Sequence, residues 1–260
     1  MIGKTGNAMH LDPRRTYRQT LRPRPGETAF QVVVEQTDLW IVARRDLSAE
    51  IGAFVHEIRA GLKNHIILDP AFAASLTPVA APQDAPDLVR RMARAAGACG
   101  VGPMAAVAGA IAQATAERFA PQSPDILVEN GGDIFMHSTV ERIVGLLARP
   151  VEGVRLGLRI PAGRFPLAVC TSSGRVGHSV SLGQADMVAV LSADGALADA
   201  AATALANLLV SEKDLKPMLA YAKKLFRQGV SGVFAQVGEG VGAVGDLELV
   251  ALGDDGKGHH

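Results

Sequence analysis

The order of predicted elements repeats once along the chain, and this repetition constrains the fold more than any single motif does. Residues 30–34 and 39–43 are β-rich runs separated by polar residues, which indicates a hairpin. Helical patterns follow, and then two short strands at 126–128 and 134–136. Strands, two helices and further strands come again between 167 and 251. This order favours an α+β fold, with antiparallel sheets and helices packed on them, over a doubly wound parallel sheet.

Apolar spacing and turn residues predict the remaining elements. Apolar residues from Ile51 to Leu62 lie on one face of a helix whose expected N-cap is Ser48. A short strand is expected at 64–68, and a glycine-rich turn is expected to separate the last two strands. The other expected helices cover 86–98, 103–119, 196–210 and 215–227, and the other strands cover 142–147, 154–160, 167–171, 187–191, 232–237 and 247–251.

Composition sets the size of the core and excludes some partners. The 260 residues are 48% hydrophobic, which is enough for a sizeable core. Lys and Arg together number 26, as do Asp and Glu, so no strongly basic field is available to hold nucleic acid. No apolar run is long enough to span a bilayer, and the polar first ten residues lack the apolar segment of a signal peptide. We therefore expect a cytoplasmic protein that binds neither nucleic acid nor membrane.

Three segments are expected along the chain. Residues 27–253 form a single α+β domain with two pseudo-repeated halves, and 254–260 form a disordered tail. Residues 1–26 form a basic arm, which is either solvated or contacts a phosphate or a second subunit. The two cysteines, Cys99 and Cys170, match no zinc or redox spacing and are expected to be buried free thiols. The arginines of the arm are Arg14, Arg15, Arg18, Arg22 and Arg24.

The sharpest local motif is Asn130-Gly131-Gly132-Asp133, between two predicted strands. Adjacent glycines let the backbone reach positive φ and approach a ligand closely, and their amides can line an anion-binding concavity. Asn130 and Asp133 can bond the polar edges of a ligand. The alternative is a plain hairpin turn, for which Asn-Gly is a leading signal.

A second polar motif follows the strand predicted at 167–171. Its hydroxyls, glycine and arginine suit the recognition of phosphate or pyrophosphate. A serine–histidine nucleophile pair is a further interpretation, although no nucleophile-elbow motif is present, and an ordinary polar loop is the simplest one. The residues are Thr171, Ser172, Ser173, Gly174 and Arg175, followed by His178.

The third motif is the pair Asp199 and Thr203 on an Ala-rich predicted helix. Residues four apart lie on the same helix face, so both oxygens can reach one ion. A carboxylate and a hydroxyl are hard ligands suited to magnesium or calcium. The alternative is structural, with Asp199 in the first turn of the helix and Thr203 bonded to a carbonyl one turn back.

Taken in order, these segments resemble the ApbE-like superfamily, whose named members are FAD:protein FMN transferases. Residues 130–133 match its NxGGD segment, residues 171–174 resemble its TSG segment, and His178 stands where a histidine often follows. Ala198-Asp199-Ala200-Ala201-Ala202-Thr203-Ala204 resembles its ADALATA helix. The resemblance covers about residues 97–237 and is closest to a compact branch of the superfamily.

The resemblance implies a fold of tandem T-fold-like units and magnesium bound by Asp199 and Thr203. It also implies FAD or FMN as ligand and an acceptor protein as partner, with homo-oligomerisation left open. Two family segments differ here: GxxxKG corresponds to the lysine-free residues 100–109, and HxxDPxTG is replaced at 179–184. Two hypotheses follow, a magnesium-dependent FMN transferase or FAD hydrolase, and a flavin- or nucleotide-binding module without transfer that serves redox or sulfur metabolism. A scaffold that acts only through its oligomer is the third hypothesis.

Overall fold

The computed structural model describes residues 21, 23–146, 154–173 and 185–253 of the chain. The strands within these ranges are β1 (Thr28–Val34), β2 (Thr37–Ala43), β3 (Ile126–Asn130), β4 (Asp133–His137), β5 (Arg142–Gly145), β6 (Arg155–Ile160), β7 (Leu167–Ser172), β8 (Met187–Ser192), β9 (Val230–Val237), β10 (Gly240–Gly245) and β11 (Glu248–Leu252). The α-helices are α1 (Ser48–Leu68), α2 (Ala71–Ala74), α3 (Asp87–Cys99), α4 (Val107–Phe119), α5 (Gly195–Asn207) and α6 (Leu215–Leu225).

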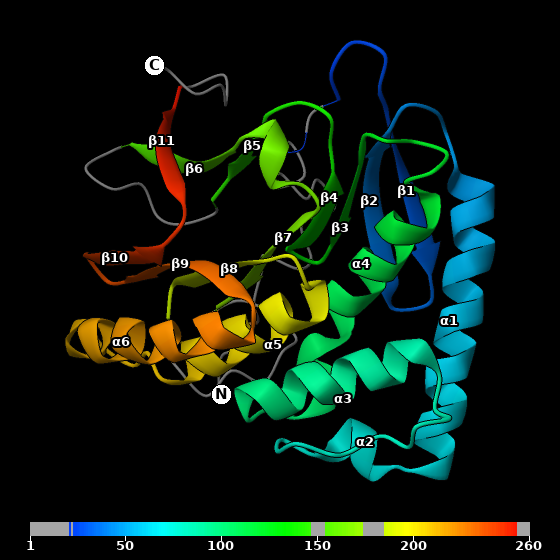
Figure 1. The fold of residues 1–260 in the computed structure, drawn as a ribbon, viewed down its shortest axis with the longest axis horizontal. Coiled ribbons are helices and arrows are strands. Elements are labelled where there is room, and N and C mark those ends of the chain that lie inside the picture. Colours follow the sequence, from blue (N-terminus) through cyan, green and yellow to red (C-terminus); the bar gives the residue numbers. More distant parts are fainter. Residues whose placement is uncertain (1–20, 22, 147–153, 174–184, 254–260) are drawn as a thin grey trace, which may run out of the picture.

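One large sheet joins the two halves of the chain. Its strand order is β1-β2-β3-β4-β7-β8-β9-β10, and every neighbouring pair is antiparallel. On each side of the central β4–β7 pair the chain runs hairpin, helices, hairpin. A smaller sheet, β11-β6-β5, combines strands from between the halves with the last described strand (Figure 1).

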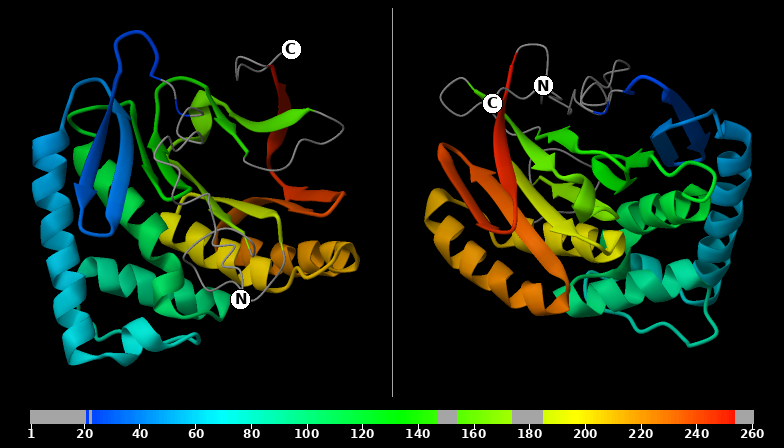
Figure 2. Two further views of the ribbon diagram at one scale, coloured as in Figure 1. Left: turned by 180° about the vertical axis from the view of Figure 1, so that it is seen from behind. Right: turned by 45° about the horizontal axis from the view of Figure 1, so that its top comes forward.

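Both faces of the large sheet are covered, because alternate residues of a strand point to opposite faces. In β7, Ala168 and Cys170 belong to the core shared with the helices, whereas Leu167 and Val169 belong to the core shared with the small sheet. Helices α4 and α5 contact the central strands, α6 contacts β9 and β10, and α1 contacts β1. Figure 2 shows the helices and the small sheet on opposite sides of the large sheet.

The structure confirms the α+β class and the antiparallel sheets with helices on them. The opening hairpin and the strands around the glycine pair are also as predicted. Cys99 and Cys170 are buried free thiols, as expected. The assignment to tandem T-fold units stays a prediction.

Three local predictions were wrong. Residues 64–68 continue α1 as helix, and the buried His65 packs edge-on against Phe72, with ring centroids 4.8 Å apart. Ser48 is the first helical residue and not the N-cap, which is Leu47. The glycine-rich segment expected as a turn contains β10, since pairing with β9 and cover from α6 outweigh the weak strand propensity of glycine.

The described helices include no single one that is long and apolar enough to cross a membrane. Helix α3, taken together with the segment from Pro103 to Phe119, passes that length and composition test only as a pair bent by 104°. Of the arginines in the expected basic arm, Arg24 alone lies within the described residues. The expected tail at 254–260 lies outside them.

Candidate functional site

The β3–β4 turn brings two glycines into backbone conformations that other residues rarely adopt. Gly131 has φ of +67° and Gly132 has φ of +110°, as a two-residue hairpin turn between twisted strands requires. A side chain at Gly131 would meet open space, whereas a Cβ at Gly132 would lie 2.9 Å from Thr171 Oγ1. The Gly132 amide donates to Glu129 Oε1 at 2.8 Å. The hairpin interpretation is therefore correct, and the turn still leaves Gly131 open to solvent or to a ligand.

Strand β7 holds this turn from the side. The Thr171 amide donates to Asp133 Oδ1 at 3.1 Å, and the Thr171 hydroxyl donates to the Gly132 carbonyl at 3.1 Å. Asn130 Nδ2 donates to the Ala108 carbonyl at 3.1 Å, just inside α4. The first and second sequence motifs therefore meet, with Thr171 as the point of contact.

Helix α5 enters the same region because two glycines allow a close helix crossing. A Cβ at Gly109 would lie 2.2 Å from the Gly195 carbonyl oxygen, so α4 and α5 could not approach as they do with any larger residue there. The approach lets the Gly109 amide donate to Asp199 Oδ2 at 2.8 Å. Because α5 begins at Gly195, Asp199 lies in its second turn. Asp194 caps the helix by accepting from the Leu197 amide. The first-turn interpretation of Asp199 was wrong.

Asp133 and Asp199 form a buried pair of carboxyl groups. They are 6% and 8% exposed. Burial, reinforced by the charge of Asp199, raises the pKa of Asp133 well above its usual range. Burial also raises the pKa of Asp199 to about 7, against the lowering effect of the Gly109 and Ala108 amides. Two carboxylates that share one buried place are costly to ionise together unless a positive charge joins them.

The described part of the chain offers this pair no cation of its own. No described Lys, Arg or His lies within ion-pair distance of Asp133 or Asp199. The nearest thiol, Cys170, is fully buried, and burial raises its pKa well above the usual range. A thiol is neutral or negatively charged, so it cannot neutralise the pair in either form.

The donor set of this pair fits a magnesium ion. Mg²⁺ is commonly held by one or two carboxylates, with waters and substrate phosphates completing its octahedron. Asp133 and Asp199 supply carboxylate oxygens, and Thr203, 7% exposed, stands one turn after Asp199 on α5. The described residues contain no group of three or more His, Cys, Asp or Glu side chains that could hold a metal. The site would therefore leave several positions on the ion for water or ligand.

On the other face of the large sheet, the same turn borders a cleft toward the small sheet. Glu129, Gly132 and Thr171 lie at its polar end, and the other lining residues are mainly apolar: Leu21, Ile134, Val144, Gly145, Leu146, Val169 and Met187. Glu129 as a whole is 2% exposed. The cleft has a volume of about 20 Å³ and holds about one water molecule, so it is a narrow crevice and not a pocket of ligand size.

Three of the predicted site residues lie outside the described part of the chain, and two residues that shape the site were not predicted from the sequence. Gly174, Arg175 and His178 lie outside the described residues, whereas Ser173 donates to the Ala185 carbonyl at 3.3 Å. Gly109 and Glu129 were not predicted as site residues. A signal for Gly109 existed, because it closes the segment that corresponds to the family's lysine-bearing motif, but only the helix crossing shows what it contacts.

Comparison with known proteins decides the family. A family model described as AbpE bacteria matches residues 18–228. The chain belongs to this family, within the ApbE-like superfamily. A UPF0280 protein of Methanocella arvoryzae is 41% identical over 199 residues, which cover 75% of this chain and 80% of that protein. A UPF0280 protein of Methanopyrus kandleri is 42% identical over 184 residues, covering 69% and 73%.

Solved structures of ApbE proteins share the fold. The apo form of the Pseudomonas stutzeri flavinyl transferase ApbE superimposes with a TM-score of 0.55 and 14% identity, covering 84% of this chain and 94% of that one. The flavin transferase ApbE of Vibrio cholerae gives 0.52 and 14%, covering 84% and 96%. At this level of identity the likeness establishes the fold of this ApbE-like chain.

Proposed function

We propose that this ApbE-like protein binds a flavin nucleotide together with Mg²⁺ at the β3–β4 turn, and that FMN transfer or FAD hydrolysis is the reaction such a complex would support. The observation that carries the proposal is the buried pair Asp133 and Asp199, for which the described residues supply no counter-charge. Proteins that are named flavin transferases share the fold. A divalent cation between this pair and a pyrophosphate would neutralise both.

Different residues of the site are proposed to contact different parts of the ligand. Asp199, Thr203 and Asp133 would hold the ion, which when bound withdraws charge from phosphate oxygens. Gly131 and Gly132 would present backbone at positive φ to the phosphates, with Asn130 fixing the turn on α4. Thr171, Ser172 and Ser173, followed by Gly174, Arg175 and His178, are proposed to complete the anion-binding side.

A second candidate is a flavin- or nucleotide-binding module without transfer. It is favoured by the composition of residues 100–109, which contain no lysine although Gly109 still supports Asp199. The metal-supporting part of that segment is thus kept without the family's lysine. An acceptor protein is a partner of the first candidate only, and the cytoplasmic location expected from the sequence stays a prediction for both.

Incubation with FAD and magnesium tests both candidates. Calorimetry should show FAD binding that requires magnesium and that Asp199→Asn weakens by at least about tenfold, because the negative charge of one ligand of the ion is lost. A matched control is Asp87→Asn, since Asp87 is exposed and pairs only with Arg90 and Arg91 on its own helix.

Release of AMP, followed by chromatography, separates the two candidates. AMP formation that Asp199→Ala abolishes would support transfer or hydrolysis, and binding without AMP would support the module. Absence of both flavin and nucleotide binding at saturating magnesium would overturn the proposed function.

A further inference from the structure

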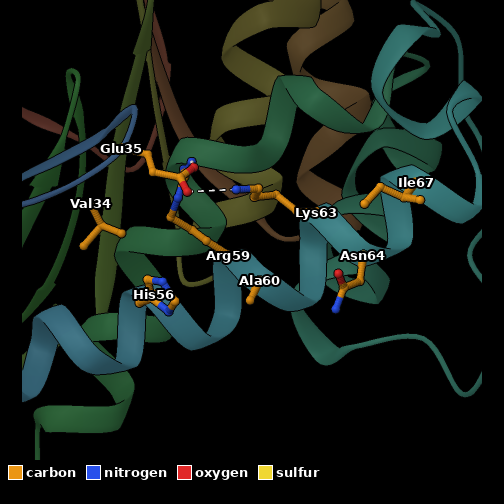
Figure 3. A pocket seen from close by; sticks show the side chains of 8 residues that line it. All are labelled: Val34, Glu35, His56, Arg59, Ala60, Lys63, Asn64 and Ile67. Atoms are coloured by element: carbon orange, nitrogen blue, oxygen red, sulfur yellow. Dashed lines mark hydrogen bonds and ion pairs between the residues drawn. The ribbon is translucent and has the colours of Figure 1, made fainter.

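Ion pairs on the helices differ in whether they lead to the candidate site. In a hollow of about 180 Å³ beside α1, Glu35 accepts from Arg59 Nη2 and from Lys63 Nζ, both at 2.8 Å (Figure 3). The residues that line this hollow lie between 34 and 67, and none of them belongs to the site. Another cluster begins on α3, where Arg91 Nη1 donates to Glu117 Oε2 of α4 at 2.8 Å, and it continues inward.

The cluster on α3 and α4 reaches the start of α5 through Gln113. Gln113 Nε2 donates to Glu117 Oε1 at 2.8 Å, and Gln113 Oε1 accepts from the Gly195 amide at 2.8 Å. The first amides of a helix have no partner within the helix, so Gln113 supplies an acceptor for one of them from outside. Gln113 is 7% exposed. A hydrogen-bonded chain therefore runs from α3 through α4 to the buried first residue of α5.

The carboxamide of Gln113 suits both of its partners. The Gly195 amide needs an acceptor, whereas the Glu117 carboxylate needs a donor, and a carboxamide provides both. These two needs fix which end of the carboxamide faces Gly195. A glutamate at this position would keep the acceptor and lose the donor, and a methionine of similar length would lose both. The hydrogen bonds of residue 113 can therefore be removed without changing the length of its side chain.

The bond made by Gln113 and the bond made by Asp199 belong to the same register of the two helices. Gly109 and Gln113 are one turn apart on α4, and Asp199 and Gly195 are one turn apart on α5. The Gly109 amide donates to Asp199 Oδ2, and one turn further along α4 the Gly195 amide donates to Gln113. A Cβ at Gly195 would lie 3.1 Å from Gln113 Cβ, so the helices are also close at this level. Helix α5 cannot slide along α4 without stretching both bonds.

We propose that Gln113 is a positioning residue, which fixes α5 on α4 so that Asp199 stays beside Asp133 at the β3–β4 turn. The inference rests on the proposed function, since it gives Gln113 its role through the magnesium site. Gln113 acts through Asp199 and not as a ligand of the ion, because its oxygen and its nitrogen are engaged by Gly195 and Glu117.

Magnesium affinity, measured by calorimetry on the full chain, tests this role. Gln113→Met should weaken magnesium binding by at least about tenfold, because Asp199 is no longer held in place although every proposed ligand remains. Ser123→Ala is the matched control: the buried Ser123 hydroxyl also accepts a backbone amide, that of Arg44, and donates to the Asp125 carbonyl. These bonds lie at the other end of the β3–β4 hairpin, so the control should keep the affinity of the parent.

Hydrogen exchange of the Gly109 amide, followed by NMR without metal, tests the geometry separately. This amide donates to Asp199, so its exchange reports whether the carboxylate is in place. Gln113→Met should speed the exchange by at least about tenfold, and Ser123→Ala should leave it near the rate of the parent. Gln113→Glu should also speed it. Adding Glu117→Gln to that variant should restore the slow rate, since donor and acceptor are then exchanged between the two positions.

The two measurements separate the possible failures. If the parent binds magnesium and Gln113→Met binds it equally well, the inference is overturned and the proposed function stands. If the parent binds no magnesium, the proposed function fails, and Gly109 exchange decides whether Gln113 positions Asp199. Unchanged Gly109 exchange in Gln113→Met would overturn the inference in either case. Circular dichroism of each variant establishes that it is folded.

Discussion

The two ends of the β3–β4 hairpin carry buried carboxylates in opposite electrostatic situations. At the open end, Asp125 accepts from the Thr139 amide at 2.6 Å and from Arg44 Nη2 at 2.6 Å. Arg142, itself paired with Glu27, lies 3.6 Å from Asp125. At the turn end, Asp133 and Asp199 receive backbone amides, but no described side chain supplies them with a positive charge.

The pKa values of the carboxyl groups at the two ends differ accordingly. Burial opposes the ionisation of Asp125, but the Thr139 amide, Arg44 and two hydroxyls outweigh it and hold its pKa at about 2. At the turn, burial raises the pKa of Asp199 to about 7 and that of Asp133 well above its usual range. The carboxylate at the open end is fully compensated by described residues, whereas the pair at the turn end has no positive charge among them. This difference is the physical basis for placing function at the turn.

The largest effect is expected from a substitution in the hydrogen-bonded network around Asp125. Asp125→Ala should destabilise the fold by about 3–5 kcal/mol. It removes one of the two carboxylates near the buried Arg142, which is 4% exposed, and it leaves the Thr139 amide without its acceptor. Urea unfolding measures the change. The exposed control Asp87→Ala should cost no more than about 1 kcal/mol. Equal losses in both variants would contradict the assignment of a buried network.

The next effect sharpens the contrast at the turn. At a hundredfold excess over its Kd, magnesium should stabilise the parent by about 2.7 kcal/mol and Asp199→Asn hardly at all. The variant should fold well without metal, since an amide removes the cost of a buried charge while keeping the shape. Thermal unfolding with magnesium and with chelator measures both. If magnesium stabilises the parent and the variant equally, Asp199 is not a ligand of the ion.

A third test addresses the backbone of the turn. Gly131→Val should cost about 1–3 kcal/mol, because φ of +67° strains a β-branched residue although its Cβ meets no atom. Gly131→Asn should cost less, since asparagine tolerates the left-handed region. Urea unfolding compares the two. No difference between valine and asparagine would show that the turn relaxes.

The smallest expected effect is the contribution of Asp125 to the pH dependence of the unfolding free energy. Because the folded pKa of Asp125 lies below its unfolded value, its stabilisation is present above about pH 4 and is lost as pH falls toward 2. Its share of the slope is at most about 1.4 kcal/mol per pH unit. Asp125→Asn should flatten the dependence of unfolding free energy on pH in this window. An unchanged slope would mean that other carboxylates dominate acid unfolding.

The sequence by itself determined the elements whose signals are local. The strands beside Asn130-Gly131-Gly132-Asp133 and the positive φ of both glycines follow from turn chemistry, and apolar spacing predicted most of the helices. The family resemblance rested on ordered motifs, and the matching family model confirms it. Such features depend on neighbours within a few residues, which the sequence displays directly.

Only the tertiary structure decided what depends on distant partners. β10 exists because β9 and α6 hold a glycine-rich segment extended, and residues 64–68 are helical because α1 continues and buries His65 against Phe72. The meeting of Asp133 with Asp199 depends on how closely α4 and α5 cross, which Gly109 and Gly195 permit. No local propensity encodes that crossing, since its geometry depends on packing between segments far apart in sequence.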